Sequence, residues 1–179
     1  MGSALCSELS KRCRRELRMT NRSWRVDETY LRIAGKWTYL YRAVDSTGAT
    51  IDFLLSVNRD ADAAPCFFQK ALRSRSHPRP RVINVDGNPS YPRVISALKT
   101  SGPLGRRCRC RPVEQDHRAI KRRVRASQGF RCFASAARTI EGIEMMHMIR
   151  KGQVRWLPKK DVVGQVRFVT QLFGISFAA

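Results

Sequence analysis

Apolar and polar residues alternate along much of the first third of the chain, beginning at Trp24. Three runs there are dense in β-branched and aromatic residues, and short breaks containing glycine separate them, as is typical of strands joined by tight turns. The three runs are residues 24–34, 37–44 and 51–57. They predict an antiparallel meander of three consecutive strands.

The period of the apolar positions changes after residue 60. Ala64, Phe67, Phe68 and Ala71 recur at the spacing of a helix face, which predicts a helix over residues 60–74 that packs on the sheet. The same criteria predict strands at 82–85 and 108–113 and helices at 92–100, 114–125 and 134–150. This order predicts an α/β fold with a mixed five-stranded sheet, three antiparallel strands first, and helices on both faces.

The 179 residues are enough for one domain with a sizeable core. Residues 1–23 are polar and basic, and we expect them to form an N-terminal segment without a core of its own. The main domain is predicted to cover residues 24–155, and residues 156–179 to form a C-terminal extension that packs on it. Because no apolar run reaches 18 residues and no secretory signal is visible, we expect a soluble, intracellular protein.

The charge of the chain is strongly unbalanced, with 35 lysines and arginines against 14 acidic residues and a formal net charge of +21. Positive charge of this size repels itself unless a polyanion shares it. Nucleic acid is therefore the expected partner, and an acidic membrane surface is the second candidate. Arginine outnumbers lysine, which suits bidentate contacts with phosphate but equally fits a GC-rich genome.

The cysteines do not form a recognisable metal or disulfide pattern. A zinc site would require pairs separated by two to four residues, and irregular spacing without a secretory signal argues against disulfides. We expect reduced, structurally incidental thiols, with metal binding as the weaker alternative. The six positions are Cys6, Cys13, Cys66, Cys108, Cys110 and Cys132.

Three acidic residues occupy positions where a carboxylate needs an explanation. Asp27 lies inside the first strand, Asp86 ends the fourth, and Glu114 opens a predicted helix. Carboxylates that converge at strand ends can hold two Mg²⁺ ions for phosphodiester chemistry. The alternative is that Asp27 pairs with a nearby arginine, Asp86 caps the following turn, and Glu114 is an ordinary acid at a helix N-terminus. Composition and spacing leave both interpretations open.

Five short blocks of sequence carry more specific information. They are WRVDETY at 24–30, GKWTYLYRAVD at 35–45, VDGN at 85–88, EQDHR at 114–118 and MIRKGQ at 148–153. Together they closely resemble the catalytic domain of the DDE transposases of bacterial insertion-sequence family six. The resemblance extends from about residue 24 to residue 173.

This resemblance implies an RNase H-like fold with an integrase-type catalytic core that cleaves and joins DNA with two Mg²⁺ or Mn²⁺ ions. It also implies that Asp27, Asp86 and Glu114 are the catalytic metal ligands and that Lys121 contacts DNA phosphate. The implied partner is double-stranded DNA, both element ends and target, bound by a homo-oligomer in the bacterial cytoplasm at the nucleoid. Further DNA-binding candidates among the neighbouring cations are Arg109, Arg111, Arg118, Arg122 and Arg125.

Two departures from the family pattern bear on activity. Residues 1–23 are too short for the end-binding helix-turn-helix region that normally precedes the catalytic domain. The segment between Asp86 and Glu114 is several residues shorter than in the family, and we expect the strand at 108–113 to fray as a result. The sequence therefore predicts a transposase, with a catalytically inactive remnant that only binds DNA as the alternative.

Overall fold

The computed structural model describes residues 10–57, 63–74, 77–86, 88–113 and 130–174. The chain divides into two compact units, one formed by Thr20–Phe133 and the other by Met1–Met19 together with Ala134–Ala179. This division follows the contacts between residues and does not test domain boundaries. The limits expected between residues 23 and 24 and between residues 155 and 156 therefore stay predictions.

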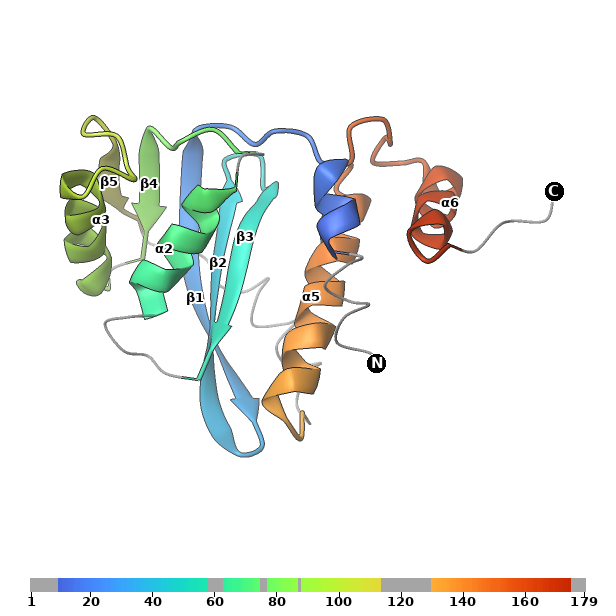
Figure 1. The fold of residues 1–179 in the computed structure, drawn as a ribbon, viewed down its shortest axis with the longest axis horizontal. Coiled ribbons are helices and arrows are strands. Elements are labelled where there is room, and N and C mark those ends of the chain that lie inside the picture. Colours follow the sequence, from blue (N-terminus) through green and yellow to red (C-terminus); the bar gives the residue numbers. More distant parts are fainter. Residues whose placement is uncertain (1–9, 58–62, 75–76, 87, 114–129, 175–179) are drawn as a thin grey trace. The chain divides into compact units, whose positions relative to one another are not determined.

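The unit Thr20–Phe133 is built on a mixed five-stranded sheet (Figure 1). The strand order is β3-β2-β1-β4-β5, in which β1, β2 and β3 are antiparallel and β4 and β5 run parallel to β1. The predicted mixed sheet, with the antiparallel meander first, is confirmed. The strands are β1 (Ser23–Ile33), β2 (Lys36–Asp45), β3 (Thr50–Ser56), β4 (Val82–Val85) and β5 (Arg109–Pro112).

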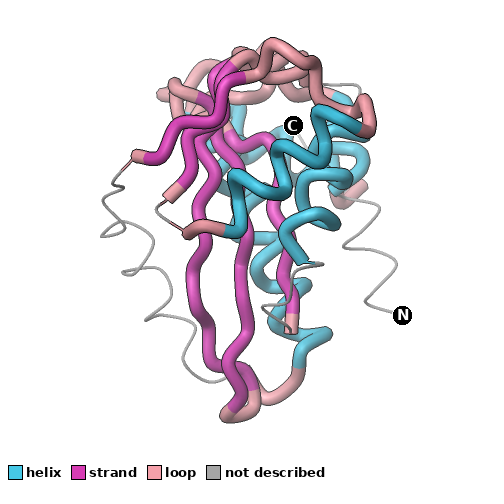
Figure 2. Tube along the Cα trace, turned by 90° about the vertical axis from the view of Figure 1, so that its left-hand side faces the viewer, coloured by secondary structure: helices cyan, strands magenta, loops and turns pink. Residues whose placement is uncertain are grey.

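Strands β1 and β2 form a long hairpin, visible in Figures 1 and 2. Ala34 and Gly35 connect them, and both have positive φ angles, 49° and 76°. Two consecutive residues with positive φ form the turn whose twist matches that of the flanking strands. Glycine takes up this conformation without strain, which explains its place in the turn.

Two helices cover one face of the sheet, namely α2 (Ala63–Arg73) and α3 (Ser90–Thr100). The apolar residues predicted to face the sheet from α2 are buried there, and Phe67 stacks on Tyr41 of β2 with ring centroids 6.0 Å apart. Trp24 and Val26 of β1 face the same core. Burial of each large side chain contributes roughly 1.5–3 kcal/mol, so this cluster is the main source of stability in the unit.

The fifth strand is intact, and the expectation that it frays is wrong as far as Val113. Strand β5 pairs with β4 over all four of its residues, and the Val113 N–H donates a hydrogen bond of 2.9 Å to the Val85 carbonyl. The helix predicted over residues 114–125, including Glu114, lies outside the described residues.

The other unit contains α5 (Phe133–Arg150), α6 (Val162–Leu172) and a helical turn at residues 10–15. Cys13 and Leu17 from the basic N-terminal segment are buried in its core beside Met148 and Phe168. Burial raises the pKa of the Cys13 thiol to about 11, so the thiol stays protonated at neutral pH.

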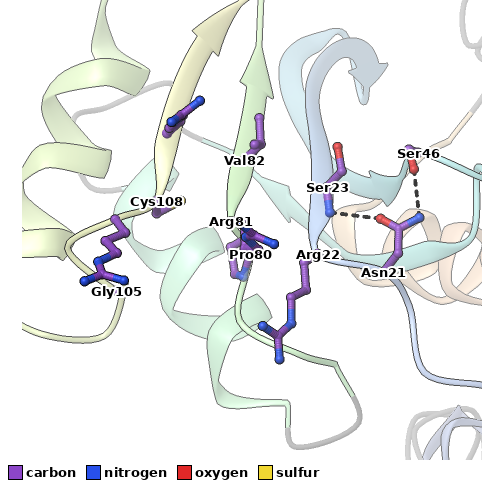
Figure 3. A pocket seen from close by; sticks show the side chains of 11 residues that line it. Asn21, Arg22, Ser23, Ser46, Pro80, Arg81, Val82, Gly105 and Cys108 are labelled. Atoms are coloured by element: carbon purple, nitrogen blue, oxygen red, sulfur yellow. Dashed lines mark hydrogen bonds between the residues drawn. The ribbon is translucent and has the colours of Figure 1, made fainter.

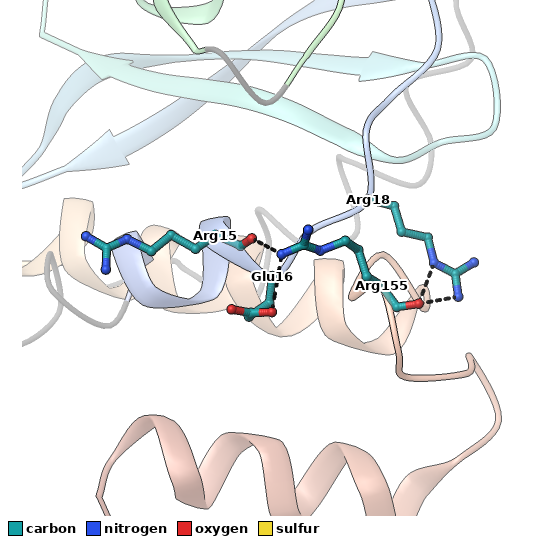
Figure 4. A network of polar contacts seen from close by, with 4 residues as sticks. All are labelled: Arg15, Glu16, Arg18 and Arg155. Carbon is teal, nitrogen blue, oxygen red and sulfur yellow. Dashed lines mark hydrogen bonds and ion pairs between the residues drawn. The ribbon is translucent and has the colours of Figure 1, made fainter.

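Polar contacts join the N-terminal segment to residues 153–155 within this unit (Figure 4). Arg155 donates hydrogen bonds to the Arg15 carbonyl at 2.7 Å and to Glu16 at 3.4 Å, and Arg18 donates to the Arg155 carbonyl at 3.0 Å. The segment is therefore an integral part of this unit. Among the described helices none has the length and apolar character needed to cross a lipid bilayer.

Candidate active site

The parallel pairing of β1 with β4 places Asp27 and Asp86 at adjoining positions. Val26 pairs with Val85 across the two strands, and each aspartate is the next residue in its own strand direction. Because successive side chains alternate between faces, Asp27 points away from the core that holds Val26. The strands that carry the two aspartates are thus neighbours, as predicted.

Asp27 is buried, with 6% of its surface exposed. Arg42 of β2 lies directly opposite Asp27 in the antiparallel register and is itself buried. Residues opposite each other on neighbouring strands share a face of the sheet. A cation at this position lowers the free-energy cost of keeping the Asp27 carboxylate ionised inside the protein.

The loop after β4 holds Asp86 against β1 through Asn88. The Asn88 backbone N–H donates a 3.2 Å hydrogen bond to Asp86 Oδ1, and the Asn88 side-chain amide donates one of 3.4 Å to Glu28 Oε2. Asn88 Oδ1 in turn accepts hydrogen bonds from the backbone and hydroxyl of Ser90, at 3.0 and 2.9 Å. Asp86 is therefore part of a bonded turn that contacts the neighbour of Asp27.

Tyr91 of α3 is buried close enough to the carboxylates for their charges to act on it. Its side chain is completely buried, and burial, followed by the negative charges of Glu28 and Asp86, raises its pKa well above the usual range. The charge of Asp27 adds to this effect. The Tyr91 phenol therefore stays protonated, and its hydroxyl has no hydrogen-bond partner among the described residues.

The donors of this site fit a hard divalent cation. Asp27 and Asp86 offer carboxylate oxygens, the ligand type that Mg²⁺ and Mn²⁺ prefer. Glu28 shares the face of Val26 by strand alternation, so it is separated from Asp27. Within the described residues no group of three or more His, Cys, Asp or Glu side chains could hold a metal, and the expected third ligand, Glu114, lies outside them.

Exposed cations lie on the same face as Asp27. Arg25 precedes Asp27 by two residues on β1, and Arg109 and Arg111 occupy the matching face of β5 through the β4 register. The remaining predicted DNA contacts lie outside the described residues. They are Lys121, Arg118, Arg122 and Arg125.

Comparison with known proteins identifies the family. A family model described as a DDE domain (DDE_Tnp_IS240) matches residues 21–153. The chain is 34% identical over 140 residues to the transposase of the insertion sequence-like element IS431mec of Staphylococcus aureus. The chain belongs to the DDE transposases of insertion-sequence family six. The resemblance of the sequence blocks is thereby confirmed.

Two further relatives match different shares of the chain. The transposase of IS257 in transposon Tn4003 of S. aureus is also 34% identical, over 75% of this chain. This chain spans about 60% of the length of these transposases. An uncharacterised protein of Yersinia pseudotuberculosis, pYV0051, is 40% identical over 88 residues.

Solved structures confirm the RNase H-like fold of this DDE transposase domain. The HTLV-2 integrase catalytic core, solved with magnesium, superposes with a TM-score of 0.52 over 77% of this chain and 95% of that domain. A simian T-cell lymphotropic virus intasome chain gives 0.54 over 80% of this chain and 59% of its own length. Sequence identity is 15% in both, so the likeness concerns the fold.

Three residues near the aspartates were not singled out by the sequence patterns. Glu28, Asn88 and Tyr91 meet only after β1, the loop following β4, and α3 come together. One signal was available for Glu28, because an acidic residue within the buried strand β1 needs a partner as much as Asp27 does.

Proposed function

We propose that residues 24–155 form the catalytic domain of a transposase that cuts DNA at the ends of an insertion sequence and transfers the strands to target DNA. The observation that supports this most directly is the placement of Asp27 and Asp86 at adjoining positions of the neighbouring strands β1 and β4. Membership of the DDE transposase family gives these two positions their expected role.

In this proposal Asp27 and Asp86 hold the metal, with Glu114 as the third ligand implied by the family. Two Mg²⁺ or Mn²⁺ ions bound there would activate the attacking oxygen and stabilise the leaving oxygen of the phosphodiester. The chain supplies a buried Asp27 opposite Arg42 and an Asp86 that is fixed by the Asn88 turn. Fixed ligands matter because a misplacement of about 1 Å can lower the rate about a hundredfold.

The DNA is bound by the cationic face around the aspartates. Arg25, Arg109 and Arg111 can contact phosphates on either side of the reacting bond. The family resemblance adds Lys121, and the neighbouring cations Arg118, Arg122 and Arg125 are further candidates. A net charge of +21 favours association with duplex DNA, and in this proposal the protein acts at the nucleoid in the bacterial cytoplasm. Element ends and target must be held together, which a homo-oligomer would accomplish.

The second candidate function is DNA binding without cleavage. The observation in its favour is the short segment between Asp86 and Glu114, which limits how freely Glu114 can reach the two aspartates. Val113 directly precedes Glu114 and its N–H is bonded to the Val85 carbonyl of β4, so no further chain lies between the fixed strand and Glu114 to extend that reach.

A plasmid-nicking assay tests the proposal. Supercoiled plasmid carrying the neighbouring inverted repeats is incubated with the full chain and Mg²⁺, Mn²⁺ or a chelator. We expect nicking with either metal, none with the chelator, and a rate at least about a hundredfold lower for Asp27→Asn, because a lost ligand costs at least as much as a lost outer-shell partner. Asp161→Asn, which changes the same charge at the start of α6, is the matched control and should nick normally.

The two candidate functions predict different results in this assay. Absence of nicking by a folded chain that still binds the plasmid would contradict the transposase proposal and support the DNA-binding alternative. Equal nicking by Asp27→Asn would show that the cleavage does not use this site.

A further inference from the structure

A pocket of about 1100 Å³ opens at the amino ends of the parallel strands β1, β4 and β5 (Figure 3). Four arginines line it, and within the described part of the chain no acidic or aromatic side chain does so. It is therefore a cationic pocket without the stacking surface that base recognition uses. The four arginines are Arg22, Arg81, Arg107 and Arg109.

Backbone pairing brings two of these arginines side by side. The Arg81 N–H donates to the Arg22 carbonyl at 2.8 Å, and the two residues precede the paired residues Ser23 and Val82. Neighbouring strands lie about 4.8 Å apart, and successive phosphates of one DNA strand advance about 3.4 Å along the duplex axis, so this pair can contact two neighbouring phosphates. Arg109 pairs with Val82, one residue further along β4, and Arg107 lies two residues before Arg109.

The four guanidinium groups are exposed and have no ion pair or hydrogen bond with other described residues. Four like charges around one pocket repel each other unless an anion lies between them. Arginine offers a planar fork of donors that fits phosphate oxygens. The arrangement therefore favours a ligand that carries several phosphates.

The wall of the pocket at β1 is fixed by hydrogen bonds. The Asn21 amide donates to the Ser46 hydroxyl at 2.8 Å, and Asn21 Oδ1 accepts from the Ser23 N–H at 2.9 Å, as the dashed lines in Figure 3 show. Asp45 holds Asn21 in turn, because its Oδ2 accepts from the Asn21 N–H at 2.9 Å. Asp45 Oδ1 already accepts from Thr47 and Ala49, so this carboxylate is occupied within the turn.

The pocket lies at the opposite end of the parallel strands from Asp86. Strand β4 begins at Val82, which lines the pocket, and ends at Val85, directly before Asp86. Four residues of extended chain separate the two ends by about 13 Å. A phosphate in the pocket is thus a different one from the phosphate at the aspartates.

We propose that this pocket binds the sugar-phosphate backbone of duplex DNA, away from the phosphodiester that reacts and without reading base sequence. This goes beyond the proposed function, because it assigns a second DNA contact to Arg22, Arg81 and Arg107, which lie outside the candidate active site. Phosphate contacts of this kind position a duplex and add affinity, and they carry no sequence information.

The salt dependence of DNA binding tests this assignment. Affinity of the full chain for a labelled random duplex is measured by fluorescence anisotropy over a range of salt concentrations. Each lost phosphate contact lowers the log–log salt slope by about 0.9, so the double variant Arg22→Gln/Arg81→Gln should lose about 1.8 from the slope. We expect its affinity near 0.1 M salt to fall at least about tenfold.

Two further variants make the test specific. Arg73→Gln/Arg93→Gln removes two exposed arginines from α2 and α3 of the same unit and should leave the slope unchanged. Arg22→Lys/Arg81→Lys keeps both charges and should keep the slope. Thermal unfolding confirms that all variants are folded, and Arg81→Gln/Arg107→Gln repeats the measurement with a second pair from the pocket.

If the Arg73→Gln/Arg93→Gln variant lost as much of the salt slope as the pocket variant, the proposal would be overturned. The loss would then follow from the lower net charge of the protein and not from the pocket. An unchanged slope in both pocket pairs would overturn it as well, and so would tighter binding of an acidic peptide than of duplex DNA. None of these readouts uses cleavage. A chain that fails to nick plasmid but shows the pocket-specific slope therefore contradicts the proposed function and leaves this inference standing.

Discussion

The two ends of the parallel strands differ in charge and in burial. At the carboxyl end of β4, Asp86 is half-buried and its neighbours Asp27 and Glu28 on β1 are buried. At the amino end, Arg22 and Arg81 are exposed to solvent. Only the four residues of β4 separate the two environments.

This difference indicates that the two ends of the strands have different functions. A buried carboxylate costs free energy unless a cation compensates it, so the acidic end is maintained for a ligand or a reaction. An exposed arginine costs little and gains mainly when a phosphate arrives. We therefore expect substitutions at the acidic end to change the rate of cleavage, and substitutions at the basic end to change the affinity for DNA.

The largest expected effect separates the two ends directly. Asp86→Asn should lower the single-turnover rate of metal-dependent nicking at least about a hundredfold at saturating DNA. Arg22→Gln/Arg81→Gln should leave this rate within about twofold, because saturating DNA compensates for weaker binding. Quench-flow measurement of the nicked product at rising DNA concentration gives both values. A much lower nicking rate of Arg22→Gln/Arg81→Gln at saturating DNA would show that the basic end also contributes to cleavage, and would contradict separate functions for the two ends.

A smaller effect is expected at the residue that positions Asp86. Asn88→Ala removes the bond to Glu28 and the two bonds from Ser90, and should lower the nicking rate about tenfold and raise the Mg²⁺ concentration that is required. The readout is the Mg²⁺ dependence of the rate, which a merely structural role would not shift.

Asn84→Ala is the matched control for Asn88→Ala. Asn84 lies on β4, two residues before Asp86, and donates a 3.1 Å hydrogen bond to the Trp24 carbonyl and not to an acid. Its loss should cost about 1 kcal/mol of stability, measured by urea unfolding, with no change in the metal dependence. The same shift in metal dependence for both variants would contradict a positioning role for Asn88.

The sequence was sufficient for most of the sheet and for the two aspartates. Alternation and glycine turns set the bounds of β1, β2 and β3 to within two residues, because one face of each strand packs on a core. Asp27 could be singled out because a charge inside an apolar strand breaks the pattern. A metal-binding role for Asp27, by contrast, can be inferred only from the family resemblance, since an aspartate paired with an arginine for structural reasons would give the same sequence pattern.

Contacts between distant segments could not be predicted in this way. Asn88 reaches Glu28 across 60 positions, and Cys13 joins the core of α5 and α6 although its own segment is mostly charged. The short segment before Glu114 predicts a frayed strand at 108–113, but chain length does not account for strand pairing. Pairing with β4 keeps the strand intact, since a buried backbone group without a partner is costly.

A third prediction concerns the stability of the acidic end. The Tyr91 hydroxyl is buried beside the carboxylates without a hydrogen-bond partner among the described residues. Removing an unsatisfied buried polar group relieves its desolvation cost, so Tyr91→Phe should raise the free energy of unfolding by about 1 kcal/mol. Urea unfolding of the two proteins measures this. A loss of about 1 kcal/mol would instead show that the hydroxyl donates to a carboxylate such as Glu28.

The smallest expected effect is a pH dependence at the basic end. Burial alone would raise the pKa of Asp45, but hydrogen bonds from the Thr47 hydroxyl and from the backbone N–H groups of Asn21, Ala49 and Thr47 lower it below its usual value. The folded chain therefore binds this proton less readily than the unfolded chain does. The stabilisation is complete above about pH 4, the usual aspartate range, and is lost as the pH falls through the lower pKa of the folded state.

Asp45→Asn isolates this contribution. The variant should be less stable than the parent chain near neutral pH, and the gap should close as the pH falls below about 4. Because Asp45 holds Asn21 in the wall of the arginine pocket, the variant should also weaken DNA binding slightly at neutral pH, with no change in the nicking rate at saturating DNA. Urea unfolding at several pH values, together with the anisotropy assay, gives both readouts. A stability gap that stays constant with pH would show that the ionised Asp45 does not anchor the wall, and a reduced nicking rate would show that the two ends of the strands are coupled.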